Sequence, residues 1–194
     1  MTDSALILLA FLLPLAGAFG IVLCGRWPNL RETVTLVTAA LNGLTVIELY
    51  GRFQQGGLSV VQLAEPLPGL AISFEIEPLG MLFALVASLL WFVTSVYAIG
   101  YMRGHGETNQ TRFYSMFAIA ISAALGVAFA GNLFTLFLFY EVLTISTYPL
   151  VAHAGTEKAR QGARTYLAIL LGTSIGLQLL AILITYAAAG TLDF

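Results

Sequence analysis

Six long apolar stretches, separated by short polar segments, restrict the fold of this chain more than any other feature. A transmembrane helix needs about 20 mostly apolar residues, and only 9% of this chain is charged, against roughly a quarter in a soluble domain. We therefore predict a single all-α integral membrane domain over residues 1–194 with six transmembrane helices. The predicted spans are Ala5–Leu23, Val34–Tyr50, Leu79–Tyr97, Phe113–Ala130, Leu133–Ala152 and Tyr166–Ala187.

The basic residues predict the orientation of these spans. Seven of the eight Lys and Arg residues fall in the three segments that join spans one and two, three and four, and five and six. They are Arg26, Arg31, Arg103, Arg112, Lys158, Arg160 and Arg164. Because cytoplasmic loops carry an excess of Lys and Arg, we expect a multi-pass protein of the inner (cell) membrane of a bacterium with both termini outside (periplasmic). The N-terminal MTDS carries no positive charge, so we interpret the first apolar stretch as a retained span, not a signal peptide.

The segment between spans two and three is the only long non-helical piece that we predict. AISFEIE, residues 71–77, alternates apolar and polar side chains, and LSVVQL, residues 58–63, is also rich in strand-forming residues. Pro66 to Gly69 has the composition of a turn. This pattern predicts a short β-hairpin on the outer surface.

Glu141 is the residue with the clearest functional implication. It lies near the middle of the apolar stretch 133–153, where a carboxylate costs roughly 2.5 kcal/mol or more. All eight Lys and Arg are assigned to loops, so we expect no basic partner at its depth within this chain. Intramembrane acids most often relay protons or ions. The alternative is a permanently protonated Glu141 that hydrogen-bonds to a Thr or Gln of a neighbouring helix.

Other polar residues repeat at helical spacing within the spans. Thr144 and Tyr148 share the face of Glu141, and Ser174 and Gln178 lie on one stripe of the last span together with Thr185. We expect Thr144, Tyr148, Ser174 and Gln178 to support a water-filled path, with simple interhelical packing as the alternative. The Gly172 and Gly176 pair predicts close helix packing. Two further polar faces are expected to turn toward the bundle interior, namely Thr35, Thr38, Asn42 and Thr45 in span two and Ser115, Ser122 and Gly126 in span four.

The chain shows no recognisable cofactor, metal or nucleic-acid site. One cysteine, Cys24, is too few for an iron–sulfur cluster. His105 and His153 are isolated at span ends, so we interpret them as interfacial side chains and not as metal ligands. No glycine-rich nucleotide motif occurs and no basic tract is present. We expect no cofactor, no nucleic-acid partner and no catalytic site of its own, so any redox chemistry would belong to other subunits.

One stretch carries a family resemblance. GNLFTLFLFYEVLTISTYPLVAHAGTEKARQGARTYLAILLGTSIGLQLLAILIT, residues 131–185, resembles the proton-conducting antiporter-like membrane subunits, and ISFEIEPLGMLFALV, residues 72–86, adds to the likeness. The family comprises subunits of NADH–quinone oxidoreductase (complex I), of membrane hydrogenases and of Mrp-type cation/proton antiporters. The residues TEKARQGARTYL, 156–167, and GTLDF, 190–194, look most similar to the D subunits of Mrp-type antiporters.

The resemblance implies an incomplete antiporter-like fold, because the family has two inverted repeats formed by helices four to eight and nine to thirteen. Residues 1–112 would hold the three N-terminal helices, the hairpin and a cytoplasmic loop, and residues 113–194 the first three helices of the first repeat. Glu141 would correspond to the fifth-helix glutamate, whose lysine partner lies on the seventh helix. We therefore expect an N-terminal portion that is inactive alone and requires the lipid bilayer and other membrane subunits, including whatever supplies helices 7–14.

The function that follows is translocation of protons, or exchange of protons for a cation such as Na⁺, by a multisubunit membrane complex. Glu141 would be its protonatable site. The alternative is a structural subunit of an NADH–quinone oxidoreductase- or hydrogenase-like complex, in which the six helices only hold their neighbours together.

Overall fold

A computed structural model of the chain describes residues 2–56, 60–67 and 69–194. Within these residues, six helices are long and apolar enough to cross a membrane, the last of them built from α6, η1 and α7 in succession. The helices are α1 (Asp3–Leu23), α2 (Pro28–Phe53), α3 (Pro78–Gly104), α4 (Gln110–Ala128), α5 (Leu133–Val151), α6 (Glu157–Thr173), the π-helix η1 (Ser174–Leu179) and α7 (Leu180–Ala189). The strands are β1 (Val61–Leu67) and β2 (Leu70–Phe74).

The helices begin where the sequence supplies capping residues. Pro28 and Pro78 open α2 and α3, because proline lacks the backbone N–H that a first helical turn leaves unpaired. The side chains of Asn132 and Thr156 accept hydrogen bonds from the backbone N–H groups of Thr135 and Ala159, which caps α5 and α6. The helix bounds therefore follow local chemistry as well as hydropathy.

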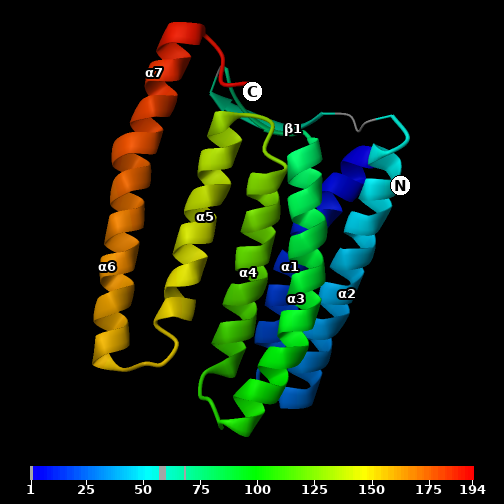
Figure 1. Ribbon diagram of the computed structural model, residues 1–194, viewed down its shortest axis with the longest axis vertical. Coiled ribbons are helices and arrows are strands. Elements are labelled where there is room, and N and C mark those ends of the chain that lie inside the picture. Colours follow the sequence, from blue (N-terminus) through cyan, green and yellow to red (C-terminus); the bar gives the residue numbers. More distant parts are fainter. Residues whose placement is uncertain (1, 57–59, 68) are drawn as a thin grey trace.

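The helices run side by side along the long axis of the molecule (Figure 1). Helix α1 packs on α2 and α4, and α3 packs on α2 and α4. Helix α5 packs on the other side of α4, and α6 packs on α5. The helix α6–η1–α7 therefore forms one edge of the molecule, and α7 extends beyond the end of α5 (Figure 1).

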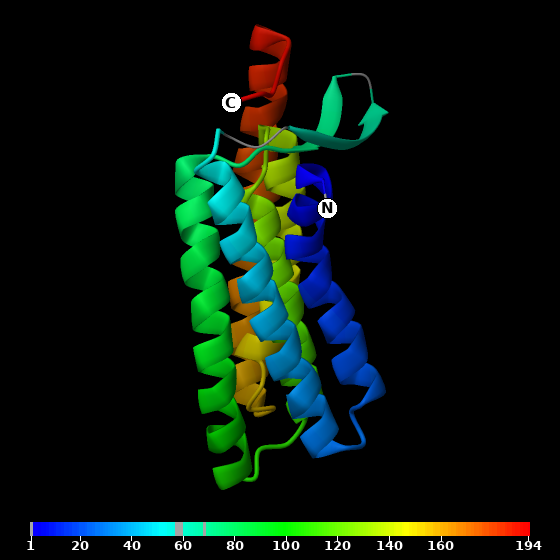
Figure 2. The ribbon, with the colours of Figure 1, turned by 90° about the vertical axis from the view of Figure 1, so that its right-hand side faces the viewer.

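Both termini and the two-stranded sheet lie at one end of the bundle, and the α1–α2, α3–α4 and α5–α6 connections lie at the other end (Figure 1, Figure 2). The end with these three connections is also the end that carries the seven clustered basic residues. We call it the basic end. Which side of a membrane it faces stays a prediction from the positive-inside pattern.

Strands β1 and β2 pair antiparallel with an irregular register, in which Val61 pairs with Phe74 and Leu67 with Leu70. The predicted hairpin segment includes residues 57–59 and Pro68, which lie outside the described residues. Strand β2 also joins the α4–α5 connection, because the N–H of Glu75 donates to the Phe129 carbonyl at 2.9 Å. The sheet is thereby fixed to the segment that starts α5.

The polar faces predicted for spans two and four are buried, which confirms that prediction. The hydroxyl of Ser122 donates to the Phe11 carbonyl of α1 at 2.5 Å, and the amide of Asn42 donates to the Ser88 hydroxyl at 3.1 Å. Packing and interhelical hydrogen bonds therefore account for these polar faces. The buried members are Thr35, Thr38, Asn42, Thr45, Ser115, Ser122 and Gly126.

Two predictions about the last span are wrong. The helix begins at Glu157, well before the predicted start at Tyr166, because its first turns carry charged residues that a hydropathy pattern rejects. The Gly172 and Gly176 pair does not make a close helix contact in the described part of the chain, since a Cβ at either position would meet no atom within 4 Å. Close packing occurs instead at Gly126, where a Cβ would overlap the Phe139 ring of α5.

The assignment of every Lys and Arg to a loop is also wrong. Arg31 and Arg52 lie within α2, and Arg103 lies within the last turn of α3. Helices that cross a membrane continue past the hydrocarbon region, so charged residues at their ends are helical.

Candidate functional site

Glu141 occupies the middle of α5, nine residues into a helix of 19 residues. This helix runs between the end with the sheet and the basic end (Figure 1). Helix α5 is long and apolar enough to cross a membrane. The position along α5 is therefore the one that the sequence predicts for Glu141.

Glu141 as a residue is half-buried, and the Oε1 atom of its carboxyl group is fully buried. Among the residues that the structure describes, Oε1 has no hydrogen-bond partner, and no basic nitrogen forms an ion pair with the carboxyl group. A buried polar atom without a partner costs about 1–3 kcal/mol. An oxygen atom in this state is available to bind a proton, a water molecule or a neighbouring group.

Two residues predicted beside Glu141 lie on the same helix face toward the basic end. Thr144 is buried and Tyr148 is half-buried. The Thr147 hydroxyl, next to them on α5, lies 3.1 Å from the hydroxyl of Tyr166 on α6. This pair links the two helices through polar atoms, and the sequence pattern did not single it out.

Ser174 and Gln178 belong to the π-helix η1, which packs against α5. Ser174 is buried, but its hydroxyl donates to the Leu171 carbonyl of its own helix at 3.3 Å. In the described residues, no hydrogen bond links Ser174 or Gln178 to Glu141. The structure thus places these residues on the neighbouring helix without joining them to the carboxyl group.

The π-helix also changes the predicted polar stripe. Ser174 and Gln178 are buried or half-buried, but Thr185 is exposed. A π turn contains more residues than an α turn, so residues after η1 are rotated relative to a regular α-helix. A pattern with 3.6 residues per turn cannot anticipate this rotation.

A buried charge cluster at the basic end was not predicted from the sequence. Arg31 and Glu32 of α2 are only 5% and 4% exposed. Glu32 accepts hydrogen bonds from Arg31 at 3.3 Å and from the Nε of Arg103 at 3.1 Å. Arg31 also donates to the Gln110 side chain at 2.7 Å. The adjacent Arg-Glu pair in the sequence was a weak signal, because charges at a span end are usually solvated.

Asn132 is a second residue that sequence reasoning missed. Its Oδ1 accepts from the Thr135 N–H at 2.8 Å, and its Nδ2 donates to the Ala71 carbonyl and the Ser73 hydroxyl of β2, each at 2.8 Å. Thr135 also accepts from the Ser73 N–H at 3.0 Å. These buried bonds fix the start of α5, and hence the helix that carries Glu141, to the sheet. The capping position was visible in the sequence, but the contacts with β2 depend on the tertiary fold.

No group of three or more His, Cys, Asp or Glu side chains within the described residues is arranged to hold a metal ion.

The chain matches two sequence families. It matches the family described as “NADH-Ubiquinone oxidoreductase (complex I), chain 5 N-terminus” over residues 69–114, and the family described as “NADH:quinone oxidoreductase/Mrp antiporter, TM” over residues 130–194. In these two regions the chain is similar to the membrane subunits of NADH:quinone oxidoreductases and Mrp antiporters. The second match contains α5, so Glu141 lies inside the region that defines this antiporter-like family.

Two curated relatives and one solved structure extend this result. The N subunit of the NADH-quinone oxidoreductase of Desulforudis audaxviator is 34% identical over 65% of this chain and 25% of its own length. The D subunit of the Na(+)/H(+) antiporter of Alkalihalophilus pseudofirmus is 24% identical over 97% of this chain and 38% of its own length. A chain of the Mrp complex from Dietzia sp. DQ12-45-1b has the same fold with a TM-score of 0.79 at 24% identity, over 100% of this chain and 36% of that one.

The antiporter-like chain therefore spans less than two fifths of the length of these relatives.

Proposed function

We propose that this chain is a proton-translocating component of a multisubunit membrane complex, with Glu141 as its buried protonatable site. The observation that carries the proposal is the Glu141 carboxyl group, which lies at mid-helix with a buried Oε1 that has no hydrogen-bond partner in the described part of the chain. Intramembrane acids that lack a structural partner are the usual sites of proton and ion relays.

The physical basis is a balance between desolvation and nearby charge. Burial disfavours a carboxylate, whereas an approaching positive charge favours it. A carboxyl group in such a position binds a proton when the positive charge is distant and releases the proton when that charge approaches. In the complete assembly, another helix or subunit would supply the positive charge.

The transported ion is a proton, either alone or in exchange for another cation. Support for exchange comes from the relative named as a Na(+)/H(+) antiporter component, to which 97% of the chain is similar. The partners we propose are the lipid bilayer and other membrane subunits, supported by the fold shared with a chain of the Mrp complex. With the basic end on the cytoplasmic side, both termini would face outward.

Thr144 and Tyr148 are proposed to support a hydrated path from Glu141 toward the basic end, because they continue its face of α5. Ser174 and Gln178 would line the same path from η1, which packs on α5. Hydroxyl and amide groups stabilise water molecules between helices where lipid cannot. These four residues have supporting roles, whereas Glu141 would carry the proton.

A structural subunit is the second candidate. The lack of any ion pair to Glu141 among the described residues is also expected of a carboxyl group that stays protonated permanently. In that case the charge of Glu141 never changes, and its replacement by a neutral isostere has no effect on transport.

Glu141→Gln in the complete complex separates the two candidates. Proton transport into membrane vesicles is measured with and without Na⁺, and the amount of inserted complex is determined by quantitative immunoblotting. We expect transport to fall by about tenfold or more, because glutamine keeps the shape but cannot exchange a proton. Glu48→Gln is the matched control, since the Glu48 side chain is 57% exposed and lies in α2. Unchanged transport in Glu141→Gln would favour the structural subunit.

A further inference from the structure

The two histidines of the chain lie at the same end of the bundle but in opposite environments. His105, at the C-terminus of α3, is exposed, its Nδ1 lies 3.0 Å from the Tyr101 carbonyl, and its ring stacks on the Tyr101 ring with centroids 4.2 Å apart. The His153 side chain, in the α5–α6 connection, is only 14% exposed. Both ring nitrogens of His153 are buried without a hydrogen-bond partner in the described part of the chain.

Three segments meet around the His153 ring. Oε2 of Glu107, from the α3–α4 connection, lies 4.0 Å from His153 Nε2. Nη2 of Arg112, from α4, donates to the His153 carbonyl at 3.5 Å, and the Arg112 Nε is buried without a partner among the described residues. The Phe113 ring packs edge-on against the imidazole with centroids 5.3 Å apart. One carboxylate and one aromatic ring therefore face the imidazole, and one guanidinium contacts the backbone carbonyl of the same residue.

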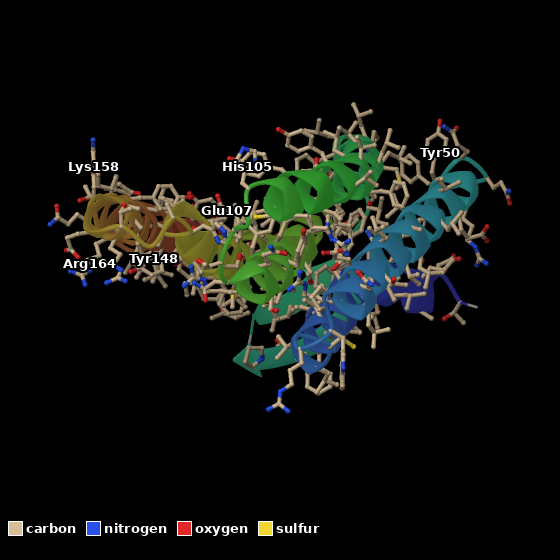
Figure 3. All side chains as sticks on the ribbon, turned by 90° about the horizontal axis from the view of Figure 1, so that it is seen from below. Tyr50, His105, Glu107, Tyr148, Lys158 and Arg164 are labelled. Carbon is tan, nitrogen blue, oxygen red and sulfur yellow. The ribbon has the colours of Figure 1, made fainter. Side chains whose placement is uncertain are left out.

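The basic residues of α6 do not belong to this group. Figure 3 shows the labelled Lys158 and Arg164 side chains at the outer edge of the molecule, away from Glu107. These two side chains and that of Arg160, the third basic residue of α6, are exposed, and none of the three makes an ion pair among the described residues. Glu107 and Arg112 are thus the charged groups that the structure brings against His153.

Three nitrogen atoms in one cluster, two of His153 and one of Arg112, are buried without partners among the residues described. Buried polar atoms in folded proteins are nearly always paired with protein or with ordered water, and a polar site of this kind can hold water molecules. An imidazole can bind a proton on one ring nitrogen and release one from the other. Glu107 is 34% exposed, so its carboxylate contacts solvent on one side and the imidazole on the other.

We propose that His153, with Glu107 and Arg112 against it, is the proton-uptake site at the basic end that supplies Glu141. This inference rests on the proposed function. A proton from solvent reaches Nε2 on the Glu107 side, and the proton on Nδ1 leaves toward the interior, so the ring has the same charge before and after transfer. Glu107 stabilises the protonated ring, whereas Arg112 opposes it.

The uptake site and Glu141 are connected along α5. Twelve residues separate them, about 18 Å at the rise of an α-helix, which is too far for direct proton transfer. Thr144, Thr147 and Tyr148 occupy the intervening turns, and Thr147 is joined to Tyr166 of α6. These hydroxyl groups would hold the water molecules that carry the proton between the two sites.

The test uses inside-out vesicles that contain the complete complex, with the basic end facing the medium, and measures the transport rate against external pH. In the wild type the rate should fall as the external pH rises, because fewer imidazoles carry the proton that is passed inward. His153→Gln should lower the rate about tenfold or more at pH 7 and abolish this pH dependence. His105→Gln is the matched control and should leave the transport rate and its pH dependence unchanged.

The two charged neighbours provide opposite expectations. Glu107→Gln removes the group that favours the protonated ring, so the midpoint of the pH profile should move to lower pH. Arg112→Gln removes the opposing charge, so the midpoint should move to higher pH. If His153→Gln fails to insert into the membrane, the pH profiles of Glu107→Gln and Arg112→Gln decide. Midpoints that move in the same direction in both variants, or that do not move, would overturn the proposal.

Glu141→Gln is measured in parallel so that the two proposals can fail separately. If Glu141→Gln abolishes transport while His153→Gln behaves like His105→Gln, the uptake site is wrong and the proposed function stands. A lower rate in His153→Gln with an unchanged pH profile also overturns the uptake site, since a structural residue would give that result. If transport persists in Glu141→Gln, the proposed function fails and the uptake site with it.

Discussion

Helices α1 to α4 and helices α5 to α7 differ in how fully they bury their side chains. In the membrane-spanning parts of α1 to α4, between 33% and 44% of residues are buried, against 22% in α5 and 11% in the helix from α6 to α7. The first group contains the interhelical hydrogen bonds of Asn42 and Ser122 and the ion pairs of Glu32. Glu141 belongs to the second group, and His153 lies in the connection that follows α5. Buried polar atoms without a partner among the described residues occur in both groups, for example Ser95 Oγ in the first and Glu141 Oε1 in the second.

The difference separates a tightly packed part of the chain from a part with more exposed surface. Interhelical hydrogen bonds and ion pairs hold α1 to α4 together, whereas we propose that Glu141 of α5 and His153 in the connection after α5 exchange protons. The exposed apolar side chains of α6 to α7, such as Ile175, Leu180 and Leu183, provide a surface for lipid or for helices of a larger assembly. Stability and function should therefore respond to mutation in different regions.

Removal of Glu32 should have the largest effect on stability. Glu32→Ala leaves the buried Arg31 without its carboxylate, and the loss of one member of a buried ion pair costs about 3–5 kcal/mol. Thermal melting of the purified protein in detergent should show a large decrease in Tm. Glu48→Ala, which breaks an exposed pair with Arg52, is the control and should have little effect. Equal effects of the two variants would contradict the assignment of stability to the buried cluster.

Asn132, at the junction of the two groups, should give an intermediate effect. Asn132→Asp keeps the Oδ1 that caps α5 but loses the two N–H donors to β2. The Ala71 carbonyl would keep only the longer bond from the Thr135 hydroxyl, at 3.4 Å. The loss of the Asn132 donors should cost about 1–3 kcal/mol, seen as a lower Tm and as faster hydrogen exchange in β2 with little change in the rest of α5. If exchange in β2 stays as slow as in the wild type, Asn132 does not fix the sheet to α5.

Two glycines should give effects of opposite sign, and the effect at Gly172 should be the smallest of all. Gly126→Ala places a Cβ against the Phe139 ring, so overpacking should destabilise the α4–α5 contact by about 1–3 kcal/mol. Gly172→Ala faces open space in the helix α6 and should raise stability by up to about 1 kcal/mol, because alanine favours helix. Melting temperatures measure both. A loss of stability in Gly172→Ala would indicate a close packing partner at Gly172. That result would contradict the looser packing of α5 to α7 relative to α1 to α4.

Much of the fold could be predicted from the sequence because hydropathy alone identifies membrane spans. The span from Leu133 and the interior position of Asn42 both follow from the pattern of apolar and polar residues. The start of α6 at Glu157 could not be predicted in this way, since a helix that leaves the hydrocarbon region no longer needs apolar residues. The π-helix η1 departs from the 3.6-residue period on which helix patterns depend.

The candidate site was predictable only in part. Glu141 stands out in the sequence because a single acid in an apolar stretch is costly. The surroundings of His153 depend on the approach of α4 and the α3–α4 connection, and residues 107, 112 and 153 carry no shared motif. The same holds for Asn132, whose partners in β2 lie about 60 residues earlier in the chain. Tertiary contacts of this kind are set by packing and not by local sequence.

Chemical labelling of Glu141 in the complete complex tests the central claim most directly. A hydrophobic carbodiimide reacts with protonated carboxyl groups, and mass spectrometry measures the modified fraction of Glu141 while proton transport is followed in the same vesicles. The account predicts that Glu141 is labelled more rapidly than the exposed Glu48 and that transport falls in proportion to the modified fraction of Glu141. Full transport after complete modification of Glu141, or no labelling of Glu141 at all, would contradict it.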